Sequence, residues 1–244
     1  MEPVPLEVLG RPPRMAEAQA IALIIPAYNE AAVIGACLAA LPPEVYQQVI
    51  VVDNGSTDDT AALARQAGAE VLSEPRRGYG QACLSGMAAL RPAIDVVVFM
   101  DADLSDDPAE VRLLLAALAS GADLAIGTRA LRALPGALSP HQRFGNWLAA
   151  RLIHWRWGVE CTDLGPFRAI RRSALTQLGM RDRNYGWTVE MQARAAQLGL
   201  RMVECNVIYR PRRAGRSKVT GTVKGSILAG IKILATWARV AIGG

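Results

Sequence analysis

A run of apolar residues that ends in two carboxylates constrains the fold of this chain most. Val96 to Met100 consists of five apolar residues, three of them valines, and Asp101, Ala102 and Asp103 follow directly. A short run with no polar residue at alternate positions is typical of a strand that is buried on both faces, as in a parallel sheet. This run therefore predicts an inner strand of an α/β protein.

Similar apolar runs recur along the first half of the chain, and each is followed by a segment with helical character. The expected strands are 21–25, 49–52, 69–72, 96–100 and 122–126. The expected helices between them are 31–41, 57–66, 78–90 and 108–119. This alternation predicts a doubly wound parallel sheet, which binds ligands at the carboxyl ends of its strands. Beyond it we expect helices over 142–157, 185–198 and 227–242, and a strand over 202–209.

Asp101 and Asp103 lie where the inner strand ends. Side chains at alternate positions of an extended segment point the same way. Two adjacent carboxylates repel each other unless a cation lies between them, and Mg²⁺ or Mn²⁺ commonly binds one or two carboxylates together with substrate phosphates. The pair therefore predicts a metal site for a diphosphate, although an Asp-rich surface turn would give the same pattern.

Composition limits the class of protein and its compartment. With 51% hydrophobic and 20% charged residues, the 244-residue chain can bury a full core. From Arg201 onward nine Lys or Arg face one acid, so the net charge of +5 belongs to the tail. Four scattered cysteines without a Cys-x-x-Cys spacing favour reduced thiols in the cytoplasm. No apolar run reaches the length of a membrane span.

Four motifs stand in an order and spacing that resemble family-2 glycosyltransferases. They are Pro26-Ala27-Tyr28-Asn29-Glu30, Val51-Val52-Asp53-Asn54-Gly55-Ser56-Thr57-Asp58, Met100-Asp101-Ala102-Asp103-Leu104-Ser105 and Gly127-Thr128-Arg129. Two later segments look like the dolichyl-phosphate mannose and glucose synthase branch: Asp163-Leu164-Gly165-Pro166-Phe167-Arg168 and Arg213-Ala214-Gly215-Arg216-Ser217-Lys218. The resemblance implies a glycosyltransferase-A fold. We expect a flexible lead-in over 1–20, the catalytic domain over 21–220 and a C-terminal amphipathic helix over 221–244.

The resemblance also implies a role for each matching residue. Those expected to bind the nucleotide sugar are Pro26, Tyr28, Glu30, Asp53, Asp101, Ala102 and Asp103. Asp101 and Asp103 would bind Mg²⁺ or Mn²⁺. Those expected to face the acceptor or a phosphate are Arg129, Arg143, Arg168, Arg216, Ser217 and Lys218. Asp103 and Arg129 would act in catalysis, and Glu190 or Asp163 could serve as a base toward a hydroxyl acceptor.

Several points stay open in the sequence. Many members of the family have Asp where this chain has Asn54, and Ser-Gly-Phe-Arg where it has Gly165-Pro166-Phe167-Arg168. Because proline lacks a backbone donor, the second departure affects the acceptor region. Gly78 and Gly80 could let the backbone approach a phosphate or could simply begin a helix.

The leading interpretation is a metal-dependent, inverting hexosyltransferase that uses GDP-mannose or UDP-glucose and a polyprenyl phosphate. The alternative is a family-2 enzyme with a hydroxyl acceptor on a soluble metabolite or glycan. A nucleotidyltransferase lacks support because Tyr28-Asn29-Glu30 is acidic where a triphosphate would bind. The carboxylates also disfavour a nucleic-acid-binding module, so we expect no nucleic acid partner.

The basic tail bears on location and partners. The expected helix over 227–242 follows a loop with five cations, and it could lie in a membrane interface with Trp237 at headgroup depth and its cations facing lipid. Alternatively it packs on the domain. We expect a cytoplasmic enzyme at the inner face of the membrane, with an anionic membrane surface and a membrane-protein partner as further contacts.

Overall fold

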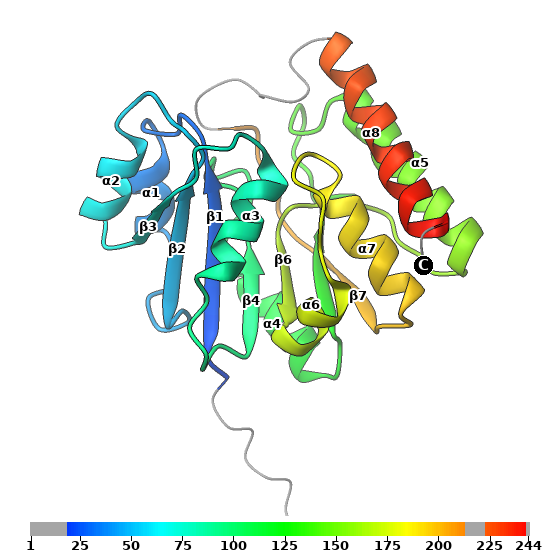
Figure 1. The fold of residues 1–244 in the computed structure, drawn as a ribbon, viewed down its shortest axis with the longest axis horizontal. Coiled ribbons are helices and arrows are strands. Elements are labelled where there is room, and N and C mark those ends of the chain that lie inside the picture. The colour runs from blue at the N-terminus through cyan, green and yellow to red at the C-terminus, as the bar shows by residue number, and fades with distance from the viewer. Residues whose placement is uncertain (1–18, 213–222, 243–244) are drawn as a thin grey trace, which may run out of the picture.

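A seven-stranded sheet forms the centre of the molecule (Figure 1). The computed structural model describes residues 19–212 and 223–242. The strands are β1 (Ile21–Ala27), β2 (Gln48–Asp53), β3 (Glu70–Ser73), β4 (Val96–Phe99), β5 (Leu124–Thr128), β6 (Arg168–Arg171) and β7 (Met202–Asn206). Their order across the sheet is β3-β2-β1-β4-β6-β5-β7. The expected doubly wound α/β architecture is confirmed.

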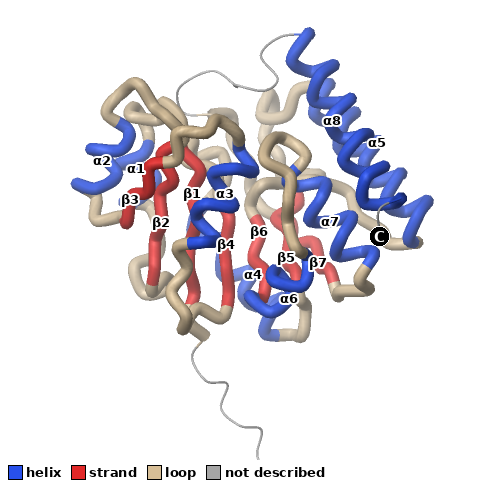
Figure 2. The backbone as a smooth tube through the Cα atoms, in the orientation of Figure 1, coloured by secondary structure: helices blue, strands red, loops and turns tan. Residues whose placement is uncertain are grey.

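Helices cover both faces of the sheet (Figure 2). They are α1 (Ile34–Ala39), α2 (Thr60–Gln66), α3 (Tyr79–Ala88), α4 (Val111–Ala119, after a 3₁₀ turn at Pro108–Glu110), α5 (Pro140–Trp157), α6 (Arg172–Leu178), α7 (Trp187–Gln197) and α8 (Val223–Ile242). Alternate residues of β1 divide between two cores, because successive strand side chains point to opposite faces. Ile24 belongs to the core that includes residues of α3, α6 and α7, whereas Ile25 belongs to the core that includes residues of α1, α2 and α4.

The strand that precedes Asp101 is buried on both faces, as its composition predicts. Val96, Val97, Val98 and Phe99 have no exposed surface. On one side β4 pairs in parallel with β1, with Ile24 opposite Phe99. On its other side β4 pairs with β6, which runs antiparallel and separates β4 from β5. The sheet is therefore mixed rather than wholly parallel. The sequence patterns did not predict β6 or α6.

Helices α5 and α8 form an outer layer beside α7 (Figure 1). Helix α5 begins earlier than predicted because of a capping box: Ser139 Oγ accepts a hydrogen bond from Gln142 N, and the Ser139 N–H donates to Gln142 Oε1. Among the described residues, no helix combines the length and the apolar character needed to cross a bilayer.

Helix α8 is attached to the body of the domain through Asp182. Lys232 Nζ lies 2.8 Å from Asp182 Oδ2, and Arg239 Nη2 lies 3.5 Å from the same atom. Trp237 packs against Trp155 and donates to the Leu152 carbonyl. The alternative prediction, that this helix packs on the domain, is the arrangement observed: Trp237 is partly covered by helix α5, and Lys232 and Arg239 face a carboxylate of the domain.

The two glycines at the start of α3 allow close packing between backbones. A Cβ on Gly80 would lie 2.0 Å from the Asp182 carbonyl oxygen, and one on Gly78 would lie 2.1 Å from the Arg183 carbonyl oxygen. The loop that precedes α7 therefore docks directly on the first turn of α3, where Gln81 N donates to Arg183 O. In this structure the space beside Gly78 and Gly80 is occupied by the backbone of the loop before α7.

We expect Gly80→Ala to destabilise the protein, since its methyl group would meet a carbonyl that cannot move without the loop. The free energy of unfolding should fall by about 1–3 kcal/mol, as for other overpacked sites. Urea denaturation followed by circular dichroism measures the change. Gly35→Ala is the matched control, because no atom lies within 4 Å of a Cβ there, and it should be neutral or stabilising. Equal stability of the two variants would contradict this explanation.

Candidate active site

The loops after β1 and β2 are joined at the carboxyl edge of the sheet, the upper edge in Figure 1. Pro26 pairs with Val52, and Ala27 pairs with Asp53, so Tyr28 and Asp53 leave their strands at about the same level. Asn29 N donates to Ser56 Oγ, and Asn29 Oδ1 accepts from Thr57 N. Asn29 has a positive φ of 51°, a conformation that asparagine tolerates better than most residues.

The acidic candidates of these two loops are largely buried. Glu30 and Asp53 are each 9% exposed. The Glu30 backbone donates to Thr60 Oγ1, and Asp53 Oδ1 accepts from Ser56 N. Their carboxylate oxygens are the acceptors that ribose hydroxyls and a base N–H require.

Asn54 explains one departure from the family pattern. Its amide nitrogen donates to the carbonyls of Glu74 and Arg76, and its amide oxygen accepts from Gly78 N. An aspartate has no donor for the two carbonyls. Asn54 therefore fixes the loop after β3 instead of contributing a charge to the site.

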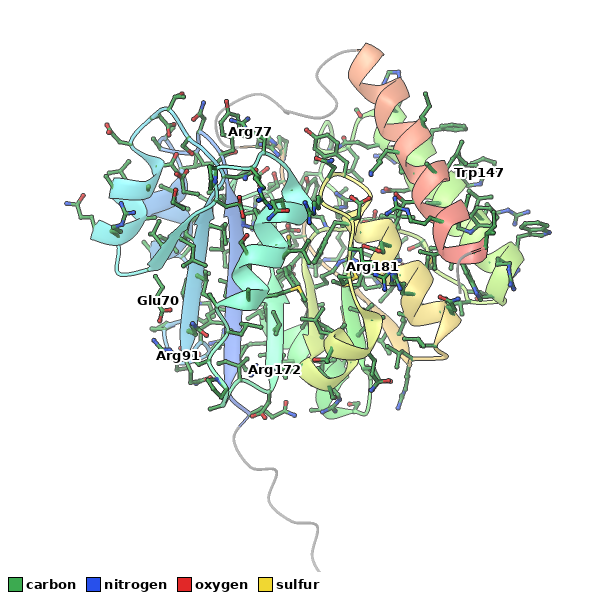
Figure 3. The ribbon with its side chains drawn as sticks, in the orientation of Figure 1. Glu70, Arg77, Arg91, Trp147, Arg172 and Arg181 are labelled. Carbon is green, nitrogen blue, oxygen red and sulfur yellow. The ribbon has the colours of Figure 1, made fainter. Side chains whose placement is uncertain are left out.

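The same loop brings in a residue that sequence reasoning missed. Arg77 stacks on the ring of Tyr28, with its guanidinium carbon 3.1 Å from the ring centroid, and it donates to the Gly55 carbonyl. Figure 3 shows Arg77 at the upper edge of the molecule, near the loops after β1 and β2. The one sequence feature that could have indicated Arg77 is the pair of arginines before Gly78, which follows the expected strand over 69–72.

Asp101 and Asp103 follow β4 as predicted, in a largely buried loop. Asp103 is 1% exposed, and its Oδ1 accepts from Ser105 N. Burial and the charge of Asp103 raise the pKa of Asp101 to about 6. Leu104, next in the chain, has a positive φ of 58°, which is strained for a residue with a branched side chain.

Arg212 reaches these carboxylates from the segment after β7. Its Nε lies 2.9 Å from Asp103 Oδ2, and its Nη1 lies 3.6 Å from Glu30 Oε1. The backbone of this segment is held in place by Arg210, whose N–H donates to the Ser105 carbonyl. Arg212 therefore joins the loop after β1 to the loop after β4, and no motif in the sequence indicated this.

The donor set suits a hard divalent cation that is completed by substrate. Two residues that follow Asp103 closely in the sequence also have buried oxygens. In the described part of the chain, no hydrogen-bond partner is found for Ser105 Oγ or for either carboxylate oxygen of Asp106. Among those same residues, no three His, Cys, Asp or Glu side chains are grouped to hold a metal ion. Two carboxylates with open positions are what a metal-bound diphosphate requires.

Arg129 is held by Asp163 in a buried ion pair. Its Nε and Nη2 donate to the two Asp163 oxygens, each at 2.7 Å, and Asn146 of α5 also donates to Asp163. Burial opposes both charges, but these hydrogen bonds outweigh it: they hold the pKa of Asp163 below its usual value and that of Arg129 above its own. With its oxygens occupied in this way, Asp163 is not available as a general base.

Two further candidates have structural positions. Glu190 is fully buried, and its carboxylate accepts from the backbone of Arg181 and Asp182 and from Arg194. The proposed role of Glu190 as a base is therefore not supported. Arg168 is also fully buried, donates to the Gly165 and Thr188 carbonyls, and has its pKa lowered to about 10 by burial. The prediction that Arg168 faces a phosphate is wrong for this structure.

A cavity of about 760 Å³ extends from the carboxylates into the outer helices. Its polar end is formed by Asp101, Arg129 and Arg212. Its apolar part lies among α5, α7 and α8 and includes Phe144, Leu148, Leu164, Pro166, Val189 and Ile233. The cavity thus has a charged end at the sheet edge and an apolar end among α5, α7 and α8.

Arg143 lines a second cavity, of about 500 Å³, that shares Asn146 with the first. Asp163, on which Asn146 and Arg129 converge, borders this second cavity. Arg143 thus lines a different cavity from Asp101, and its expected role toward the acceptor or a phosphate stays a prediction. Arg216, Ser217 and Lys218 lie outside the described residues.

Comparison with known proteins agrees with this geometry. Residues 22–179 match the model of glycosyl transferase family 2. An uncharacterised glycosyltransferase of Mycobacterium tuberculosis is 42% identical over 212 residues, which cover 86% of this chain and 94% of the relative. An undecaprenyl-phosphate mannosyltransferase of Micrococcus luteus is 32% identical and covers 85% and 90%, respectively.

A solved structure resembles the whole domain. Glucosyl-3-phosphoglycerate synthase of Mycobacterium tuberculosis, in complex with Mn²⁺, uridine diphosphate and glucosyl-3-phosphoglycerate, superimposes with a TM-score of 0.74 at 26% identity and covers 92% of this chain and 80% of that one. The fold and the sequence match define a class of transferase, the glycosyltransferases. The chain belongs to glycosyl transferase family 2, and the expected glycosyltransferase-A fold is confirmed.

We expect Asp101→Asn and Asp103→Asn each to abolish sugar transfer while the protein stays folded, because each removes a charge that would hold the cation. Turnover with Mg²⁺ or Mn²⁺, and Mn²⁺ affinity by titration calorimetry, are the measurements. Asp95→Asn, which keeps the amide-for-acid change but lies at the other end of β4, is the control. Wild-type turnover by both site variants in metal-free buffer would exclude the metal role.

Asp53→Ala should weaken donor binding, since one charged hydrogen bond to the nucleoside would be lost. Such a bond contributes about 1.5–3 kcal/mol, or roughly tenfold to a hundredfold in affinity. Titration calorimetry with the free nucleoside diphosphate measures this without turnover. Unchanged affinity would remove Asp53 from the donor site.

Proposed function

We propose that this protein transfers a hexose from a nucleotide sugar to a polyprenyl phosphate, with inversion at the anomeric carbon and with Mg²⁺ or Mn²⁺ as cofactor. The observation that carries the proposal is the shape and lining of the larger cavity. It joins two arginines and a carboxylate at the sheet edge to an apolar passage among α5, α7 and α8. A phosphate attached to a long hydrocarbon chain is complementary to both ends.

On the donor side, Glu30 and Asp53 would accept hydrogen bonds from the nucleoside, and Tyr28 with Arg77 would form a surface for the base. Asp101 and Asp103 would hold the cation, with Pro26 and Ala102 setting the backbone around them. Once bound, the cation neutralises charge on the leaving diphosphate. Arg212, now beside Asp103, is placed to pair with phosphate oxygens that arrive there.

On the acceptor side, Arg129 would position the lipid phosphate, and the bidentate pair with Asp163 fixes the direction of its guanidinium. A phosphate oxygen is already an anion, so it attacks the anomeric carbon without a general base. The new carbon–oxygen bond forms on the face opposite the diphosphate, which departs with the electrons of the bond it loses. A single displacement of this kind inverts the configuration.

The relatives support this choice of acceptor. The Micrococcus luteus relative is named as an undecaprenyl-phosphate mannosyltransferase. A lipid acceptor resides in a membrane and a nucleotide sugar is soluble in the cytoplasm, so we place the enzyme at the inner face of the membrane. We also propose a membrane-protein partner for the tail. Arg216, Ser217 and Lys218 are proposed to contact the same phosphate.

A second candidate is transfer to a soluble hydroxyl acceptor. The similar structure of glucosyl-3-phosphoglycerate synthase favours it, since its complex holds a glycosylated phosphoglycerate. A hydroxyl needs a base in most mechanisms, and neither Glu190 nor Asp163 has a free carboxylate oxygen directed at the cavity in this structure. The lipid phosphate is therefore the better candidate.

The proposal predicts turnover when GDP-mannose or UDP-glucose is combined with a detergent-solubilised polyprenyl phosphate and Mg²⁺ or Mn²⁺. The product should have the anomeric configuration opposite to that of the donor, as measured by NMR coupling constants. Retained configuration, or turnover with 3-phosphoglycerate but not with the lipid, would overturn the proposal.

A variant in the apolar part of the cavity separates the two ends of the site. Leu148→Ser should raise the KM for a long polyprenyl phosphate at least severalfold while nucleotide affinity stays unchanged. Leu113→Ser on α4, which does not line the cavity, is the matched control.

A further inference from the structure

Helix α5 carries aromatic side chains on its solvent side. Phe144, Trp147 and Trp155 are 60%, 56% and 75% exposed. With Arg151 they are spaced three or four residues apart, so the four side chains form one stripe along the helix. Large aromatic residues usually bury most of their surface, and three on one stripe call for a contact outside the domain.

The neighbouring helix continues this surface. On α8, Ile231, Leu234 and Ile242 are 57%, 43% and 84% exposed. The two helices are packed together, with the rings of Trp155 and Trp237 6.0 Å apart and the two helices side by side in Figure 1. Figure 3 shows Trp147 on the outer side of this pair. We call the exposed apolar residues of α5 and α8, together with Arg151, the outer face.

The charges around the outer face have one sign. Neither α5 nor α8 contains an aspartate or a glutamate. Arg143, Arg151 and Arg156 of α5 are exposed. On α8, by contrast, Lys232 and Arg239 face Asp182 of the domain. Among the side chains that the structure describes in this layer, the cations without an acidic partner are therefore those of α5, the helix that also carries the aromatic stripe.

We propose that the outer face of α5 and α8 lies on an anionic membrane, with Trp147 and Trp155 at headgroup depth. Tryptophan favours the bilayer interface, and arginines near the surface are attracted by anionic lipids. The larger cavity has Gly145 and Ile233 in its lining, from the facing sides of the same two helices. A lipid tail could thus pass from the bilayer to the sheet edge between them; this last step rests on the proposed function.

Helix α5 is also connected to the charged end of the larger cavity. Asn146, on the inner side of α5, donates to Asp163, which in turn holds Arg129. A helix that rests on the bilayer is in this way connected by two side chains to the arginine at the charged end of the cavity. The membrane and the acceptor phosphate would then be recognised by opposite sides of one helix.

Sedimentation with sucrose-loaded vesicles tests the inference on the full-length chain. Wild type should bind vesicles that contain phosphatidylglycerol, and Trp147→Gln/Trp155→Gln should bind at least about tenfold more weakly. Arg151→Gln should lose about fivefold on these vesicles and change little on phosphatidylcholine alone. Leu113→Gln is the matched control: it removes an exposed leucine (44%) from α4 and should bind as wild type does.

Trp155 also contacts Trp237, so folding of the variants is checked by thermal unfolding, and Trp147→Gln alone serves if the double variant is unstable. Failure of wild type to bind anionic vesicles at low salt, or wild-type binding by Trp147→Gln and the double variant alike, would overturn the inference. A wild-type dimer in analytical ultracentrifugation that Trp147→Gln dissociates would also overturn it, because the outer face would then join two copies.

Turnover of a short, water-soluble prenyl phosphate distinguishes this inference from the proposed function. The Trp147→Gln/Trp155→Gln variant should use it at the wild-type rate, because neither tryptophan lines the larger cavity. If wild type binds vesicles but uses no prenyl phosphate, the membrane surface stands and the acceptor is wrong. If it uses the prenyl phosphate but ignores vesicles, the outer face is wrong and the acceptor stands.

Discussion

Repulsion between buried carboxylates at one edge of the sheet sets the requirements for the rest of this structure. Asp101 and Asp103 share the end of β4, with Glu30 close enough for one guanidinium to reach both loops. Two acids at such close range remain charged only if cations are supplied from elsewhere in the chain. Arg212 arrives from the segment after β7, and Arg129 arrives from the end of β5. The C-terminal half of the domain thus supplies the charges that the N-terminal half requires.

The motif residues could be predicted because their roles follow from strand ends. Asp53, Asp101 and Asp103 each follow an apolar run, and the carboxyl ends of neighbouring parallel strands meet at one edge. Arg212 and Arg77 could not be found in this way, because each reaches the site from a loop whose path depends on tertiary packing. Both follow an expected strand closely in the sequence, Arg77 after 69–72 and Arg212 after 202–209, but neither pattern indicates where the loop turns.

Arg168 and Glu190 show the opposite limit. Arg168 lies in a recognisable motif and Glu190 in an expected helix, and charged residues are rarely buried without partners. A sequence does not reveal that Arg168 meets the Gly165 and Thr188 carbonyls, or that Glu190 binds the backbone of Arg181 and Asp182. Strand β6 escaped prediction for a related reason: its four residues, two of them arginines, have no apolar run. Helix α8 was predicted, but its attachment through Asp182, about 50 residues earlier, was not.

The position of β6 also has a consequence for how the chain folds during synthesis. Strand β4 pairs with β1 early, but its other edge stays open until Arg168–Arg171 has been made, about 70 residues later. At typical rates of translation this interval lasts roughly 4–14 s. During that time Val96–Phe99, which is apolar and free of charge, presents unpaired backbone groups to any other strand. The strand that leads into the carboxylate pair is therefore a point at which a nascent chain is exposed to aggregation.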